Sequence, residues 1–388
     1  LELALKISTD TSPFPEIMGR LCPHDRLCEG DCTLNDGHGA ITIGSVETFI
    51  NETAFEKGLT PTYAKEKSGK KVAIIGSGPL GLSAATFLMR QGVQVSMYEQ
   101  ADKAGGLLTY GIPNFKLDKT IVERRIGWLL DAGMKLHLNT KVRIDIYFDA
   151  FTANHDAVNL GVGATKSNLA GIENEEHTSV FKAIEFLTAV QKHLFGSSLE
   201  ATFDVKEKRV VVIGGGDTAM DCLRTSIRQG AKRVTCLYRR DKANMPASKK
   251  EFKNAVEEGA EFAFLTAPKK VIVENGVVTG VEVVKMALGT PDEKGRQSVE
   301  EVAGSCEIIP CDIVIMALGF SVDVPFPVDT NRWGGVDVDP FGRTSDPKVY
   351  SGGDCVRGAD LVVSAAFDGR EIAQTLVDPL AECDGHGK

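Results

Sequence analysis

Three cysteines lie within eleven residues near the start of the chain, in the stretch GRLCPHDRLCEGDC. Cys22, Cys28 and Cys32 have the spacing C-x5-C-x3-C. A disulfide cannot use three thiols, and zinc sites usually show closer pairs with a second pair or histidines downstream. An iron–sulfur cluster takes thiolates from one loop and often its remaining ligand from elsewhere. The spacing favours a cluster, while zinc, with His24 and His38 nearby, and free thiols stay open.

A glycine motif follows a continuous apolar run in KVAIIGSGPLGL and opens a helix. Gly76-x-Gly78-x-x-Gly81 would let the backbone turn tightly and approach a pyrophosphate at the helix N-terminus. Glu99 ends the next strand, at the position where an acid accepts hydrogen bonds from a ribose. This context predicts a dinucleotide site whose adenosine ribose has no 2′-phosphate. The expected contacts are Gly76, Gly78, Pro79, Gly81, Glu99 and Gln100.

A second motif of the same kind follows the apolar run KRVVVIGGG. Its third small residue is Ala219, which still allows close packing of helix on strand. The next strand ends in Arg239 and Arg240 instead of an acid, and arginines favour a 2′-phosphate by charge and bidentate hydrogen bonds. We therefore expect NADPH here in preference to NADH. The expected contacts are Gly214, Gly216, Asp217, Thr218, Ala219, Arg239 and Arg240.

Two such sites in one chain suggest a resident FAD and an exchanging NADPH. A GGD turn, Gly352 to Asp354, precedes the last helix, and by analogy with two-dinucleotide flavoproteins Asp354 would hold the ribityl chain while the next helix points its positive end at the flavin ring. The loop Gly105 to Leu117 should line the flavin. Further expected cofactor contacts are Gly106, Leu107, Lys116, Gly319, Gly353, Asp354 and Leu361. No side chain is expected to be a catalytic acid or base.

The elements that must position these loops are of the α/β class. Two βαβ units predict two Rossmann-like dinucleotide-binding domains, and a strong hairpin signal stands at Asn275-Gly276. The first 68 residues read as helical. One helix in ELALKIS would be stopped by Pro13 and Pro15, and a second would end at Gly58. The second helix would bury the apolar residues Val46, Phe49, Ile50, Ala54 and Phe55.

Composition narrows the class of protein further. The 388 residues carry a net charge of −9 without a basic tract, which disfavours a nucleic-acid partner. The longest apolar runs are strand-sized, so we expect no membrane helix, and no signal peptide is apparent. The unequal cysteine spacing suits a reduced cytoplasmic compartment. The other cysteines, at 222, 236, 306, 311, 355 and 383, are expected to be buried small hydrophobes.

Long stretches of the sequence resemble the small (β) subunit of bacterial NADPH-dependent glutamate synthase, a family related to the flavin half of dihydropyrimidine dehydrogenase. They are GRLCPHDRLCEGDCTLND, AITIGSVETFIN, GGLLTYGIPNFKL, GGGDTAMDC, YRRDKANMPAS and GGDCVRGADLVV. The resemblance spans essentially the whole chain. It implies FAD in the first site, NADPH in the second, and two [4Fe-4S] clusters in an N-terminal helical iron–sulfur domain.

The resemblance also implies ligands for the clusters. One cluster would use Cys22, Cys28, Cys32 and an upstream cysteine, and the other would take Glu47, which holds the acidic position of the TIG-x-x-E helix. No cysteine precedes Cys22 in this sequence. We therefore expect the missing ligands to come from residues before Leu1.

These expectations define an electron-input subunit. Residues 1–68 would form the helical iron–sulfur domain, 69–168 with 319–388 the FAD domain, and 169–318 the NADPH domain. Electrons from NADPH would pass through FAD and clusters to a large (α) subunit that makes glutamate from glutamine and 2-oxoglutarate. The same chemistry serving another acceptor, ferredoxin or a pyrimidine, stays open. A disulfide-type flavin reductase is disfavoured because no CxxC lies between the sites, and a non-enzymatic module because the arginine pair is intact.

Overall fold

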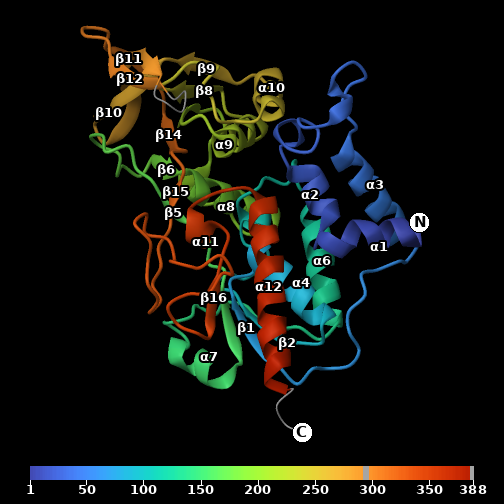
Figure 1. The fold of residues 1–388 in the computed structure, drawn as a ribbon. Helices are drawn as coiled ribbons and strands as arrows, with labels where there is room; N and C mark the ends of the chain where they lie inside the picture. Colours follow the sequence, from blue (N-terminus) through green and yellow to red (C-terminus); the bar gives the residue numbers. More distant parts are fainter. Residues whose placement is uncertain (292–296, 385–388) are drawn as a thin grey trace. The chain divides into compact units, whose positions relative to one another are not determined.

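A computed structural model describes residues 1–291 and 297–384 (Figure 1). Its contacts divide the chain into two compact units, Leu1–Lys166 with Ser321–Lys388, and Ser167–Phe320. Each unit contains a five-stranded parallel sheet, which confirms the predicted α/β class with two Rossmann-like halves. The chain passes between the units through two short paired strands, β5 (Lys166–Ser167) and β15 (Phe320–Ser321).

The sheet of the first unit has the order β16-β4-β1-β2-β3. Successive residues of β1 face opposite sides: Ile74 lies in the core under α4, α6 and α12, while Ile75 packs with the aromatic residues of α7. Both faces are therefore buried, as a parallel sheet requires. The strands are β1 (Lys71–Ile75), β2 (Gln94–Tyr98), β3 (Lys135–His137), β4 (Ala157–Leu160) and β16 (Val349–Ser351), and the helices after residue 70 are α4 (Pro79–Arg90), α5 (Leu107–Tyr110), α6 (Lys119–Asp131), α7 (Phe148–Asn154), α11 (Asp354–Arg357) and α12 (Val362–Asp384).

The second unit repeats the plan with the strand order β6-β14-β7-β8-β9 and adds a separate antiparallel sheet. The predicted hairpin at Asn275-Gly276 is confirmed, and both residues have positive φ, 52° and 77°, as the tight turn demands. The parallel strands are β6 (Val180–Lys182), β7 (Arg209–Ile213), β8 (Arg233–Tyr238), β9 (Glu261–Phe264) and β14 (Ile313–Met316); the antiparallel ones are β10 (Thr266–Glu274), β11 (Val277–Pro291), β12 (Gln297–Glu301) and β13 (Glu307–Pro310). The helices are α8 (Ala183–Leu194), η3 (Ala201–Phe203), α9 (Asp217–Arg228) and α10 (Lys249–Glu257).

The first 68 residues are helical, as predicted. They form α1 (Glu2–Thr11), α2 (Pro15–Leu21), the short turns η1 (His24–Arg26) and η2 (Thr33–Asn35), and α3 (Ile43–Glu56). Pro15 does more than stop α1: it is the first residue of α2, where its missing N–H costs nothing. Gly58, with φ of 78°, ends α3 as expected.

The predicted apolar face of α3 is wrong in part. Val46 and Phe49 are 45% and 69% exposed, whereas Ala54 is buried as predicted, together with Gly44 and Asn51, which were not predicted. The reason lies in how α2 crosses α3. A Cβ on Gly19 would come 2.5 Å from the carbonyl oxygen of Gly44, so two glycines set the helix contact and not the larger apolar residues.

The N-terminal helices share a core with the sheet of the first unit. Phe14 and Ile17 are fully buried in the same apolar cluster as Leu88 of α4 and Leu129 of α6. Figure 1 shows α2 beside α6, and α3 packs against both α1 and α2. Residues 1–68 are thus packed as part of the first unit, whereas the second unit, which contains residues 169–318, has apolar cores of its own.

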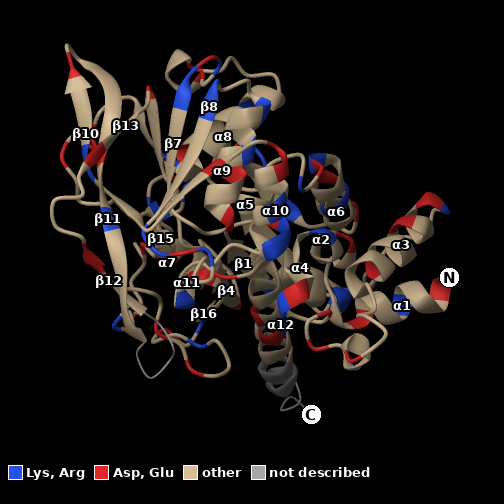
Figure 2. Ribbon diagram, turned by 90° about the horizontal axis from the view of Figure 1, so that it is seen from above, with Lys and Arg blue, Asp and Glu red and all other residues tan. Residues whose placement is uncertain are grey.

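Charged residues of both signs are interspersed along the elements of both units (Figure 2). This agrees with the modest net charge of −9. Within the described part of the chain, no helix combines the length and apolar character that a bilayer crossing requires.

Candidate functional site

The first glycine loop has the close approaches that a dinucleotide fingerprint requires. Gly76 has φ of 101°, and a Cβ there would collide with the carbonyl oxygen of Gly161 at the end of β4. A Cβ on Gly81 would collide with the carbonyl oxygen of Gly76, so this glycine lets α4 pack on the loop. Gly78 differs, because a Cβ there would meet nothing within 4 Å. The open backbone at the N-terminus of α4 fits a pyrophosphate.

Glu99 lies buried at the end of β2, next to this loop. Its Oε2 accepts hydrogen bonds from the Ser77 amide at 3.1 Å and the Ser77 hydroxyl at 2.5 Å, and its Oε1 accepts one from the Ala101 amide at 2.8 Å. A carboxylate has about four acceptor sites, so at least one is left for a ribose hydroxyl. Pro79 is the first residue of α4 and Gln100 is exposed beside Glu99.

Ser77 was not predicted, yet it joins three parts of this site. Its hydroxyl donates to Glu99 and accepts from the Gly105 amide at 2.9 Å. The next residue, Gly106, has φ of 53°, and a Cβ on it would stand 2.9 Å from the Cα of Gly78. The Gly105–Leu117 loop is therefore anchored against the first glycine loop. The only signal in the sequence was a small residue between two motif glycines.

The same loop is held by hydrogen bonds from a buried lysine that was not predicted from the sequence. Lys119 is 4% exposed, and its Nζ donates to the carbonyl oxygens of Leu108 at 2.9 Å and Ile112 at 2.6 Å. It thereby fixes both ends of α5, which begins at the predicted contact Leu107. The predicted Lys116 is half-buried three residues before it. A lysine two residues after a buried leucine carried no pattern that distinguished it from a surface lysine.

The C-terminal turn lies against the start of α4. Gly353 has φ of 61°, and a Cβ on it would come 3.3 Å from Leu80 and 3.2 Å from Ala365 of α12. Asp354 follows, half-buried, and burial raises its pKa to about 6. Leu361 leads into α12, its carbonyl oxygen accepting from the Ala365 amide. Gly353, Asp354 and Leu361 thus belong to the same unit as the first glycine loop, whereas the predicted Gly319 lies in the second unit.

The second glycine loop has the same construction. A Cβ on Gly214, whose φ is 141°, would collide with the carbonyl oxygen of Ala317 at the end of β14. A Cβ on Gly216 would meet nothing within 4 Å, and Ala219 is fully buried one turn into the helix. Asp217 starts α9 and accepts a hydrogen bond from the Ser248 amide at 2.9 Å, with Thr218 beside it. The open backbone again lies at a helix N-terminus.

The two arginines after β8 have different surroundings. Arg239 is exposed, whereas Arg240 is half-buried and its Nε donates to the Gln297 carbonyl oxygen at 3.2 Å. The Arg240 carbonyl in turn accepts from the Leu265 amide. Arg240 therefore fixes the loop, and Arg239 has its charge directed to solvent and available for a 2′-phosphate.

The cysteine loop runs from the end of α2. Cys22 caps α2, and burial, then the charges of Cys28 and Glu47, raise its pKa to about 12. Burial also raises the pKa of the exposed Cys28, whose sulfur lies 3.5 Å from Nδ1 of His24. Cys22, Cys28 and Glu47 are thus close enough to interact. Cys32 stands apart in its contacts, accepting from the Ile41 amide at 3.5 Å.

Within residues 1–291 and 297–384, no three His, Cys, Asp or Glu side chains converge as they would around a single metal ion. A four-iron cluster spans more space than one ion and binds thiolates that accept N–H hydrogen bonds. The amide beside Cys32 and the backbone amides that lower the pKa of Cys28 supply such donors. The donor set therefore fits a cluster.

The other cysteines follow the prediction with one correction. Cys222, Cys236, Cys311 and Cys355 are buried. Cys306 is exposed, because it lies in the polar turn before the edge strand β13 and not within a sheet. The side chain of Cys383 lies outside the described residues.

Matches to known protein families agree with the nucleotide loops and the cysteine loop described above. Residues 70–369 match the pyridine nucleotide-disulphide oxidoreductase family, and residues 1–59 match dihydropyrimidine dehydrogenase domain II, 4Fe-4S cluster. The chain is 48% identical to the glutamate synthase [NADPH] small chain of Escherichia coli (strain K12), over 97% of this chain and 83% of that protein. It is 45% identical to the putative oxidoreductase AegA of the same organism, over 98% of this chain and 60% of that protein.

A solved structure supports the fold alone. The structure of Mycobacterium tuberculosis FprA in complex with NADPH aligns with a TM-score of 0.71 at 18% identity, over 81% of this chain and 85% of that one. The matching families confirm the predicted cofactors, FAD, NADPH and [4Fe-4S] clusters. The chain belongs to the pyridine nucleotide-disulphide oxidoreductase family and, within it, to the family of NADPH-dependent glutamate synthase small chains.

Proposed function

We propose that this protein is the electron-input subunit of an NADPH-dependent glutamate synthase. One observation carries the proposal. The two glycine loops have the same construction, but the strand after each loop is followed by the opposite charge: Glu99 after β2, and Arg239 with Arg240 after β8. A carboxylate suits a free ribose and arginines suit a 2′-phosphate. The first loop would therefore hold FAD and the second NADPH.

FAD, when bound, accepts a hydride from NADPH and can release the two electrons singly. The chain itself binds and orients. Gly78 and Gly216 leave open backbone for the pyrophosphates at the N-termini of α4 and α9. Ser77 and Lys119 hold the loop that would line the flavin, as the hydrogen bonds of both side chains to that loop suggest. We assign no side chain as catalytic acid or base.

The remaining assignments follow from position. Asp354, at the start of α11, and the N-terminus of α12 would face the flavin side of the first loop. The proposed cofactor contacts are those expected from the sequence: Pro79, Gln100, Gly106, Leu107, Lys116, Asp217, Thr218, Gly319, Gly353 and Leu361, in addition to the loop glycines and charged residues already named. Cys22, Cys28, Cys32 and Glu47 would be the cluster ligands that this chain contributes.

The proposed partner is a large subunit that makes glutamate from glutamine and 2-oxoglutarate. The small-chain name of the relative that is 48% identical supports this partner. Another acceptor is the second candidate, because a relative named only as a putative oxidoreductase is nearly as similar, at 45%. We place the reaction in the cytoplasm, with neither nucleic acid nor membrane as a partner.

The test uses the purified protein and the glutamate synthase large subunit. The chromophore released on denaturation should be FAD, and NADPH should reduce it much faster than NADH does. With the large subunit, glutamine and 2-oxoglutarate, NADPH oxidation should yield glutamate. FMN, or no flavin, would refute the first assignment. Rapid reduction of FAD without any glutamate would instead favour the second candidate.

A further inference from the structure

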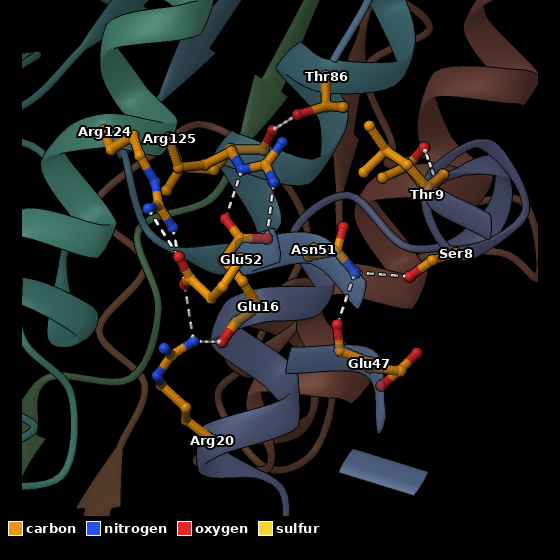
Figure 3. Close-up of polar contacts among 12 residues, drawn as sticks. Ser8, Thr9, Glu16, Arg20, Glu47, Asn51, Glu52, Thr86, Arg124 and Arg125 are labelled. Atoms are coloured by element: carbon orange, nitrogen blue, oxygen red, sulfur yellow. Dashed lines mark hydrogen bonds and ion pairs between the residues drawn. The ribbon is translucent and has the colours of Figure 1, made fainter. Parts of the chain in front are cut away.

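One ion pair in the first unit is completely shielded from solvent. Arg125 of α6 and Glu16 of α2 both have fully buried side chains. Their contact has two points: Nε of Arg125 donates to Oε1 of Glu16 at 2.8 Å, and Nη2 donates to Oε2 at 2.6 Å (Figure 3). Such a fork fixes direction as well as distance, since both groups are planar.

A second, less buried set of charges lies beside it. Arg124 donates to both carboxylate oxygens of Glu52 on α3, each at 2.8 Å, and Arg20 of α2 reaches the same carboxylate at 3.0 Å. Nη1 of Arg20 also donates to the carbonyl oxygen of Glu16 at 2.7 Å. Figure 3 shows these side chains from α2, α3 and α6 converging. The adjacent arginines of α6 thus hold α2 and α3 separately.

The three helices joined here carry or support the proposed redox sites. α2 runs directly into Cys22, and α3 carries Glu47 one turn before Asn51. At the other end of the connection, α6 begins at Lys119, whose Nζ holds the proposed flavin loop at Leu108 and Ile112. One helix, α6, is therefore bonded both to α2, which leads into the cysteine loop, and to the loop that would line the flavin.

We infer that Glu16 and Arg125 are positioning residues. They set the placement of α2, and of the cysteine loop that follows it, on the flavin-binding half of the chain. The inference rests on the proposed function. An apolar contact could bury the same surface, but it would lack the directional two-point geometry with which this ion pair fixes α2 against α6. Electron transfer between sites depends steeply on their separation, so a small shift of α2 would slow electron delivery without changing either site.

The experiment compares three variants of the full chain with its cofactors bound. Arg125→Lys keeps the charge and loses the fork. The double variant Glu16→Gln with Arg125→Met removes both charges while keeping the volumes, and it provides a folded protein if the lysine variant does not fold. Glu123→Gln, on the same helix as Arg125, is the matched control, because it breaks the exposed ion pair of Glu123 with Lys103 in the loop before α5.

Three quantities are measured for each variant: hydrogen exchange of the α2 amides, NADPH-driven reduction of a two-electron dye, and glutamate formation with the large subunit. In the Arg125→Lys and double variants we expect faster exchange in α2 and an unchanged dye rate. Glutamate formation should fall by about tenfold or more, as small misplacements do elsewhere. Flavin and iron contents should stay at the wild-type level, and the control should match the wild type throughout.

Three results would overturn the inference. Full glutamate formation in a folded variant would show that the pair positions nothing. Parallel loss of dye reduction and glutamate formation, or failure of both variants to fold, would show a general structural role. A wild-type protein that reduces the dye but forms no glutamate would count against the proposed function instead, and the exchange of α2 would then decide the inference alone.

Discussion

At the scale of single residues, the site depends on polar groups that are held in place by their neighbours. Glu99 receives three hydrogen bonds within its own loop region, and Ser77 transmits that order to Gly105. Arg239 is the opposite case, since it is exposed after β8 while its neighbour is tied to Gln297. Arg239 and Arg240 therefore have different surroundings, and substituting each one separately can distinguish their roles.

Arg239→Ala should impair the use of NADPH and spare NADH. A charge-assisted phosphate contact is worth about 1.5–3 kcal/mol, so the KM for NADPH should rise roughly ten- to hundredfold. Arg240→Ala should weaken the binding of both NADPH and NADH, because it also removes the hydrogen bond to the backbone of Gln297. Steady-state kinetics of dye reduction with each donor checks this. Equal losses for the two donors in Arg239→Ala would mean that this arginine does not recognise the 2′-phosphate.

Asp354 should make the protein less stable as the pH rises. Burial raises its pKa from 3.8 to about 6, so the folded protein favours the protonated form. A raised carboxyl pKa contributes stability at low pH that is lost as the pH passes from about 4 to about 6. Asp354→Asn should abolish this dependence in flavin-free protein, as thermal unfolding from pH 4 to pH 7 would reveal. A constant difference in Tm across that range would argue against burial as the cause.

At the scale of elements, the strands, helices and turns with strong local signals were predictable. The βαβ units, the Asn275-Gly276 hairpin and the helix of residues 43–56 all follow from periodicity and turn chemistry. The buried face of that helix was not predictable. Phe49 is exposed because α2 crosses the helix at Gly19 and Gly44, a contact that exists only in the folded chain. Ser77 and Lys119 were missed for a similar reason: their partners are distant in sequence or are backbone atoms.

The glycines of each loop should divide into two classes on substitution. Gly81→Ala should destabilise the protein, because the new methyl group would collide with the Gly76 carbonyl and push α4 from β1. Gly78→Ala should fold normally, since the space is open and φ is −69°, yet lose FAD because the methyl group would occupy the proposed pyrophosphate position. Thermal unfolding and bound flavin measure the two effects.

Gly216→Ala extends the same reasoning to the second loop. Its φ of −91° suits any residue and nothing lies near the added methyl group, so FAD content and stability should not change. The KM for NADPH should rise sharply, because the backbone can no longer approach the pyrophosphate. Normal NADPH kinetics in this variant would place the nucleotide elsewhere. The comparison with Gly78→Ala tells which loop binds which nucleotide.

At the scale of the whole molecule, the entry of electrons and their proposed exit use different parts of the chain. The glycine loops lie at the ends of β1 and β7, whereas the cysteines follow α2 in the N-terminal helices. The sequence predicted both sets of site residues but not the Glu16–Arg125 ion pair, because that pair joins residues 109 positions apart. Because the glycine loops and the cysteine loop use different residues, we expect that the cysteine loop can be disabled while the glycine loops continue to work.

Cys28→Ser should separate the two activities. Cys28 is exposed and serine is of similar size, so the variant should fold and keep its FAD. NADPH-driven reduction of a two-electron dye should continue at the wild-type rate, because neither glycine loop is altered. Iron content should fall, and glutamate formation with the large subunit should be lost. Cys306→Ser is the matched control, since it removes an exposed thiol far along the sequence and should change none of these quantities. Stoichiometric zinc in the wild type, or a Cys28→Ser variant that forms glutamate at full rate, would show that this loop does not carry the electrons out.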